Sequence, residues 1–356
     1  MPSSISSFER TIPALPWNRL TWVASLLTVG AVLAWELYCR SLGYAPTLND
    51  TPDLWAQRRE AVRSNSIVIV GDSRALFVLD LDELEKGLGQ RPIQLAIAGS
   101  CAYPILANLA ADQKFQGTVI CSIVPLMFFA PGGPLIANSE DALKKHRTWT
   151  VSQRASHELA MLLEARIAFL KQDDLTLSQL LKRLPIPNRP GAQVPPPLPP
   201  YFSTCDHERR TRMFAGCAHP GPLQTRVKTG WLPLFTPPPP PSFVPKEIFL
   251  DGVHRAVEAR FHDAAAAVKT IRSRGGKVVF VRLPVSGEIK KIEDQATPRV
   301  GPWTRLLTES GAPGIYFEDY PDLAGFDCPE WSHLSNEGSI ELSRRLAPHL
   351  KKALSE

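Results

Sequence analysis

Ile67-Val68-Ile69-Val70-Gly71-Asp72-Ser73-Arg74 is the stretch around which the rest of the sequence is organised. Its four β-prone apolar residues predict a buried strand, and the Gly-Asp-Ser that follows predicts a tight turn at the end of that strand. Such a turn would present Ser73 at its tip. A serine in this position becomes a nucleophile when a histidine elsewhere in the chain takes its proton.

Further short apolar runs alternate with helical patterns along the chain. They predict strands at Pro92–Ala98, Gly117–Pro125, Lys277–Leu283 and Gly314–Glu318. Helices are expected at residues 53–63, 75–88, 139–184, 246–274, 303–309 and 335–353. Continuous apolar strands are typical of a parallel sheet covered on both faces, and their alternation with helices indicates a doubly wound α/β fold.

An uncharged segment near the N-terminus predicts a membrane anchor over residues 19–39. Residues 20–35 carry no charge, and Trp22 and Trp35 lie where an aromatic belt would place them. A cleaved signal peptide and a buried core helix are the alternatives, although no A-x-A cleavage site follows the apolar core. Arg10 and Arg19 precede the segment and favour a single pass with the main domain outside the cytoplasmic membrane.

The remaining boundaries follow from composition. Residues 1–18 form a polar segment, residues 40–64 a connector, and residues 65–184 and 246–356 the two parts of the α/β domain. The intervening segment, residues 185–245, contains half of the 34 prolines and reads as an insertion, either a lid or a disordered loop. The runs Pro195–Pro200 and Pro237–Pro241 predict polyproline II structure.

Composition argues against several classes of protein and site. The net charge of +5 comes from interspersed charges, with no dense basic run that would indicate nucleic acid binding. The six cysteines show no C-x-x-C spacing, and the histidines show no metal-ligand spacing, so we expect no metal and no cofactor. A Cys205–Cys217 disulfide is expected only outside the cytoplasm, and a bridge between Cys101 and Cys328 is a further alternative.

The best candidate for the general base is His333, in the loop between the last predicted strand and the terminal helix. In a parallel sheet this loop and the Ser73 turn lie at the same carboxyl edge, so the two side chains can converge. Glu330, three residues earlier, is placed to orient the imidazole, and Asp327 is the alternative carboxylate. Arg74 and Arg282 flank strand ends and are interpreted as surface ion pairs or as contacts to an anionic ligand.

These motifs together resemble the SGNH/GDSL hydrolase superfamily over residues 66–130 and 276–350. Gly71-Asp72-Ser73 is similar to its first motif, Gly99 to its second, and Glu330-x-x-His333 to its last, which normally reads Asp-x-x-His. The resemblance implies a flavodoxin-like, three-layer α/β/α fold and acyl ester chemistry. The asparagine of the third motif is missing after the third strand, so the oxyanion hole would rest on the backbone N–H groups of Ser73 and Gly99.

An anchored, divergent member of this superfamily resembles proteins that act on cell-envelope or exported polysaccharides, including those of alginate acetylation and teichoic-acid D-alanylation. The resemblance implies a serine esterase or acyltransferase for O-acetyl groups in the periplasm. It also implies an acyl donor or acylated polysaccharide as substrate and a membrane-bound O-acyltransferase as partner. The alternatives are a non-catalytic polysaccharide-binding or scaffold subunit and a secreted esterase.

Overall fold

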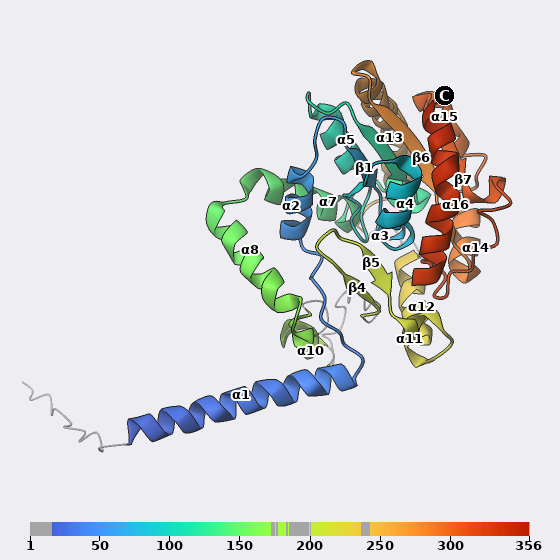
Figure 1. Ribbon diagram of the computed structural model, residues 1–356. Coiled ribbons are helices and arrows are strands. Elements are labelled where there is room, and N and C mark those ends of the chain that lie inside the picture. Colours follow the sequence, from blue (N-terminus) through green and yellow to red (C-terminus); the bar gives the residue numbers. More distant parts are fainter. Residues whose placement is uncertain are drawn as a thin grey trace, which may run out of the picture.

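The structure is a computed structural model that describes residues 16–171, 175, 177–182, 184, 199, 201–235 and 243–355. Most of the polar segment 1–18 and nearly all of the two proline runs lie outside the described residues. The remaining chain is organised around one sheet, which lies in the upper right part of Figure 1.

The sheet contains five parallel strands in the order β2-β1-β3-β6-β7. Its strands are β1 (Ile67–Val70), β2 (Ile93–Gln94), β3 (Thr118–Ser122), β6 (Lys277–Arg282) and β7 (Gly314–Tyr316). Every residue of β1 is buried, as its continuous apolar sequence predicts. The strand order reverses beside β1, which is the point where ligands bind in open α/β sheets.

Helices cover both faces of the sheet. On one face α16 (Asn336–Ser355) packs against α3 (Ser73–Val78), α4 (Leu81–Leu88), β6 and β7. On the other face α13 (Lys246–Ser273) packs against α5 (Tyr103–Ala111), α15 (Pro302–Ser310) and β6 (Figure 1). The α/β class predicted from the sequence is therefore confirmed.

The single helix predicted over residues 75–88 is in fact two helices, and the chain breaks between them at Leu79-Asp80. Asp80 accepts hydrogen bonds from the backbone N–H groups of Asp82 and Glu83, at 3.0 and 3.1 Å, and so caps the start of α4. An aspartate at this position favours a new helix start over continuation of the preceding helix.

Other helices connect the sheet to the periphery. The predicted helical region 139–184 contains several elements rather than one helix. The structure has α2 (Pro52–Glu60), α6 (Pro125–Phe128), α7 (Pro134–Thr148), α8 (Val151–Glu164), η1 (Ala168–Leu170), α10 (Leu177–Lys182), α14 (Gly287–Ala296) and η2 (Phe317–Asp319). Of these, α6, α14 and η2 had no helix prediction from the sequence.

The middle of the proline-rich insertion is folded. It contains the hairpin β4 (Ser203–Cys205) and β5 (Thr211–Met213), followed by α11 (Ala215–Ala218) and α12 (Pro222–Phe235). Phe202, Met213 and Val227 are buried in the same hydrophobic core as the sheet. The insertion therefore shares the core of the α/β domain and contributes side chains to it.

Helix α1 (Trp17–Ser41) projects from the rest of the chain (Figure 1). Its most apolar window has a mean hydropathy of 1.6, and none of that window is buried, so the interpretation as a core helix is wrong. Its length and composition fit a membrane span, features that a signal sequence shares.

All six cysteines are described and are free thiols, so neither disulfide considered from the sequence is formed. Cys217 is buried in the core, whereas Cys205 lies on β4. Burial raises the pKa of the Cys101 and Cys328 thiols, which argues against a thiolate nucleophile beside the candidate site.

Candidate active site

The turn after β1 has the geometry that its sequence predicts. A Cβ atom on Gly71 would lie 2.8 Å from the Cβ atoms of both Ala75 and Ser122, so the close packing of α3 against β3 requires glycine here. Asp72 is buried, and its side chain accepts a hydrogen bond of 2.8 Å from the backbone N–H of Arg74. This cap places Ser73, which is half-buried, at the first position of α3.

Glu330, and not Asp327, is the carboxylate that contacts the candidate base. The imidazole Nδ1 of His333 lies 3.0 Å from Glu330 Oε1, and the His333 backbone N–H donates to the same oxygen. Asp327 is exposed and makes no hydrogen bond to His333. Because a carboxylate accepts at Nδ1, this pair leaves Nε2 as the nitrogen able to take a proton.

A third partner of Glu330 comes from the insertion. Trp231, on α12, donates its indole N–H to Glu330 Oε2. The two oxygens of this fully buried carboxylate are therefore bonded to different parts of the chain. The sequence offered no signal for Trp231, since 99 positions separate it from Glu330 and nothing local links them.

Aromatic side chains enclose the imidazole of His333. The ring centroids of Phe77, Trp231 and Phe202 lie 4.3, 5.5 and 6.0 Å from that of His333. His333 is fully buried, and its Nε2 has no hydrogen-bond partner among the described residues. A buried, unpartnered nitrogen is rare unless a ligand or a moving group completes its bonding.

The Nε2 atom of His333 is not hydrogen-bonded to Ser73 or to any other described residue. Phe77, which contacts the His333 ring, is one helical turn after Ser73, so both side chains lie on one face of α3. Hydrogen bonds between a nucleophile and its base are often long in unliganded proteins and shorten when substrate binds. The structure therefore leaves the predicted pair unjoined among the described residues, and helix α3 contacts the imidazole through Phe77.

The loop that carries Glu330 is held by the start of α14. Ser286 donates its backbone N–H to the Trp331 carbonyl at 3.0 Å, and its hydroxyl donates to the Cys328 carbonyl at 3.1 Å. Trp331 has a φ of +79°, and a Cβ atom on Gly287 would lie 2.1 Å from the Trp331 ring. A strained tryptophan packed on glycine is an unusual arrangement, and such strain concentrates at functional sites.

Gly99 lies two residues after Ile97, which pairs with the residue at the start of the Ser73 turn. The Ile97 N–H donates to the Gly71 carbonyl at 3.0 Å, so the chain continues beside the turn beyond β2. Gly99 has a φ of +59°, and its carbonyl accepts a hydrogen bond of 2.9 Å from the Asn138 side chain. Asn138, on α7, is an exposed amide beside Gly99 that spacing in the sequence did not single out.

Arg74 and Arg282 form a buried ion cluster rather than the expected surface pairs or ligand contacts. Both guanidiniums bind Glu293 on α14, and all three side chains are at most 3% exposed. Burial disfavours the Glu293 carboxylate, but the two guanidiniums outweigh it and lower the pKa of Glu293 to about 2. The cluster connects the residue after Ser73 to β6 and α14.

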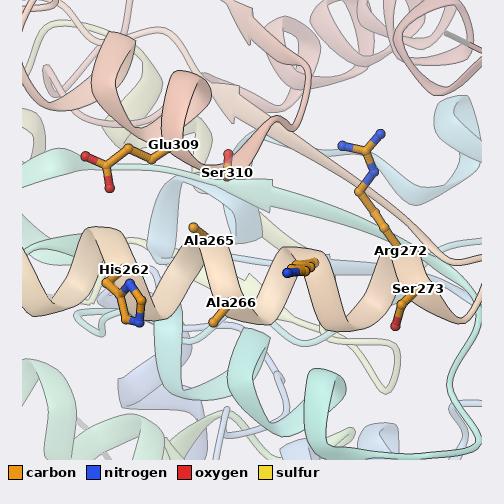
Figure 2. Close-up of a pocket in the computed structure, with 8 residues that line it drawn as sticks. His262, Ala265, Ala266, Arg272, Ser273, Glu309 and Ser310 are labelled. Atoms are coloured by element: carbon orange, nitrogen blue, oxygen red, sulfur yellow. The ribbon is translucent and has the colours of Figure 1, made fainter.

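Two surface grooves lie apart from this site. Figure 2 shows the first, between α13 and α15, which is lined by His262 and Arg272 of α13 and by Glu309 and Ser310 of α15. The second lies between α8 and residues 205–207. Among the described residues, no group of three or more His, Cys, Asp or Glu side chains is arranged to hold a metal ion.

Comparisons of the chain with models of protein families, with curated proteins and with solved structures found no match.

Proposed function

We propose that this protein is a membrane-anchored serine esterase or acyltransferase that acts on O-acetyl groups of a cell-envelope or exported polysaccharide. The observation that carries this proposal is the buried Glu330–His333 pair, whose imidazole contacts Phe77 on the helix that Ser73 begins. The polysaccharide substrate, the extracytoplasmic location and a membrane-bound O-acyltransferase as partner rest on the resemblance to SGNH hydrolases.

In the proposed reaction, Ser73 Oγ attacks the acyl carbonyl carbon while His333 Nε2 takes the hydroxyl proton. The N–H groups of Ser73 and Gly99 stabilise the oxyanion, and His333 then returns the proton to the departing sugar oxygen. Water or another sugar hydroxyl next attacks the acyl-serine, with His333 again as base. Glu330 keeps the proton of the imidazole on Nδ1 throughout.

The direct test is to trap the acyl-serine. The full-length protein in detergent would be mixed with p-nitrophenyl acetate, quenched in acid and digested for peptide mass spectrometry. We expect the mass of one acetyl group on Ser73 and no acetyl group at that position in Ser73→Ala. Acetyl groups spread over surface lysines, with none on Ser73, would contradict the proposal.

Trp231 gives a second prediction. The substitution Trp231→Phe keeps an aromatic ring but removes the N–H that donates to Glu330 Oε2. Because a hydrogen bond to a buried charge is worth about 1.5–3 kcal/mol, we expect kcat/KM for p-nitrophenyl acetate to fall by about 10–100-fold. Trp303→Phe, at a buried tryptophan on α15, is the matched control and should leave kcat/KM within about twofold.

If Trp231 has only a structural role, Trp231→Phe should lower the melting temperature. The variant should then keep kcat/KM unchanged at a temperature where it is folded. The pH–rate profile separates the two roles, because only a change at Glu330 alters the pH dependence of the base that it orients. An unchanged profile and an unchanged rate in the folded variant would show that the indole N–H does not support catalysis.

A non-catalytic, polysaccharide-binding or scaffold subunit is the second candidate. The full burial of His333 beside Phe77 and Trp231 favours it, because Nε2 is buried and a substrate must reach this atom for catalysis. The lack of the third-motif asparagine after β3 also favours a non-catalytic role. Absence of acetyl transfer to Ser73 combined with retained binding of acetylated polysaccharide would support this second function.

A further inference from the structure

The last turns of α1 are fixed to the α/β domain by specific hydrogen bonds. Glu36 accepts from the backbone N–H groups of Ala168 and Phe169 in η1, at 3.0 and 3.2 Å. Arg40, one turn later, donates to the Arg166 carbonyl at 3.0 Å. The segment that follows α8 is therefore attached to α1, and the end of α8 cannot lie far from it.

These contacts also place the attached segment at a definite height relative to a bilayer. Trp35 and Tyr38 flank Glu36 on α1, are 41% and 52% exposed, and have ring centroids 5.5 Å apart. Exposed tryptophan and tyrosine near the end of a membrane span lie at the headgroup level. Because Glu36 lies between them, Ala168 and Phe169 lie at the same level.

The end of α8 that leads into this segment presents apolar side chains to solvent. Leu159, Leu162 and Leu163 are 64%, 56% and 53% exposed and recur at helical spacing on one face. Soon after η1, α10 adds Leu177 and Leu181, which are 71% and 51% exposed. Clusters of exposed leucines of this kind are uncommon on soluble surfaces and mark interaction sites.

We propose that this leucine face, formed by Leu159, Leu162 and Leu163 of α8 and continued by Leu177 and Leu181 of α10, rests in the headgroup region of the lipid bilayer. The proposal rests on α1 spanning that bilayer. The face then fixes the tilt of the α/β domain relative to the bilayer, because a single span can tilt and carry the attached domain with it. It acts as an interfacial amphipathic surface and not as a second span.

The attachment to α1 is what selects lipid as the occupant. A face held at headgroup level by Glu36 and Arg40 meets lipid without any further partner. α10 is too short to cross a bilayer, and α8, with 14 residues, is also below the length of a span. A second copy of the chain or another protein on the same face is the outcome that the test must separate from lipid.

The test measures the depth of single labels in vesicles. The full-length chain would carry a nitrobenzoxadiazole label on Leu162→Cys, with Leu27→Cys in α1 as the insertion control and Val300→Cys, 86% exposed between α14 and α15, as the control remote from α1. The unsubstituted chain measures background labelling, which should be low because five of its six cysteines are buried. Vesicles of phosphatidylethanolamine and phosphatidylglycerol would contain phosphatidylcholine with a shallow doxyl quencher or, for the label at Leu27 near the middle of α1, with a deep doxyl quencher.

We expect the label at Leu162 to lose most of its emission to the shallow quencher and the label at Val300 to lose none. Quenching at Leu27 without quenching at Leu162 would overturn the inference while leaving the anchor in place. No quenching at Leu27 would show that α1 does not span the bilayer, and this result would overturn the inference as well. A label at Leu162 that is shielded in detergent in proportion to protein concentration would assign the face to a second copy and would also overturn it. Catalysis is assayed separately, so a failure of the proposed esterase function is distinguishable from a failure of this inference.

Discussion

Replacing Ser73 with alanine is expected to lower the turnover of p-nitrophenyl acetate by about 10⁴-fold or more, and His333→Ala is expected to have the same effect. The two residues supply the nucleophile and its base, so neither can act without the other. For the same reason the double substitution should be no slower than either single one. The measurement is steady-state hydrolysis by the full-length protein in detergent, corrected for release without protein.

The two candidate carboxylates provide the internal control for this prediction. Glu330→Gln should lower turnover by up to about 10⁴-fold, because the amide no longer fixes the tautomer of His333. Asp327→Asn should change it by less than about twofold, since Asp327 is exposed and does not contact the imidazole. Equal acetate release by the wild type, Ser73→Ala and His333→Ala would exclude the esterase and favour the binding or scaffold role.

The largest effect on stability is expected at the buried ion cluster. Glu293→Gln removes the carboxylate that both Arg74 and Arg282 bind, and all three side chains are almost completely buried. Breaking a buried ion pair by removing one partner costs about 3–5 kcal/mol. At about 2–4 °C per kcal/mol for a domain of this size, the melting temperature should fall by about 6–20 °C.

Glu288 offers a matched control on the same helix. It is 48% exposed and pairs with Lys291, so Glu288→Gln should change stability by less than about 1 kcal/mol. Replacing Arg74, Arg282 and Glu293 together with apolar residues of similar volume should recover most of the lost stability, because desolvation of the charges is then avoided. A Glu293→Gln variant that melts with the wild type would show that the cluster is not a major stabilising element.

The cluster also predicts how stability depends on pH. The pKa of Glu293 is about 2 in the folded protein, below its ordinary value of 4.5. A carboxyl group with a lowered folded pKa stabilises the fold above the unfolded pKa and loses that contribution as pH falls through the folded value. Part of the wild-type stability should therefore disappear between about pH 4.5 and pH 2, and Glu293→Gln should lose less over the same range.

Local sequence patterns were sufficient for the elements nearest the site. The run Ile67–Val70 followed by Gly-Asp-Ser forms a buried strand and a capped turn, because strand and cap depend on adjacent residues. Glu330 and His333 were predicted as a pair because three positions in a loop are within reach of one local turn. The break at Asp80 was also within reach of the sequence, since its capping hydrogen bonds are local, but the apolar periodicity of residues 75–88 hid it.

Only the tertiary structure decided which distant side chains complete the site. The residues of the strand, the Ser73 turn and the Glu330–His333 pair follow from neighbours in the sequence, and so does the apolar helix α1. The contacts of Trp231 with Glu330, of Asn138 with Gly99 and of Arg74 with Glu293 join segments far apart in the chain. No periodicity or cap encodes such contacts, because they depend on how the helices and the insertion pack over the carboxyl edge of the sheet.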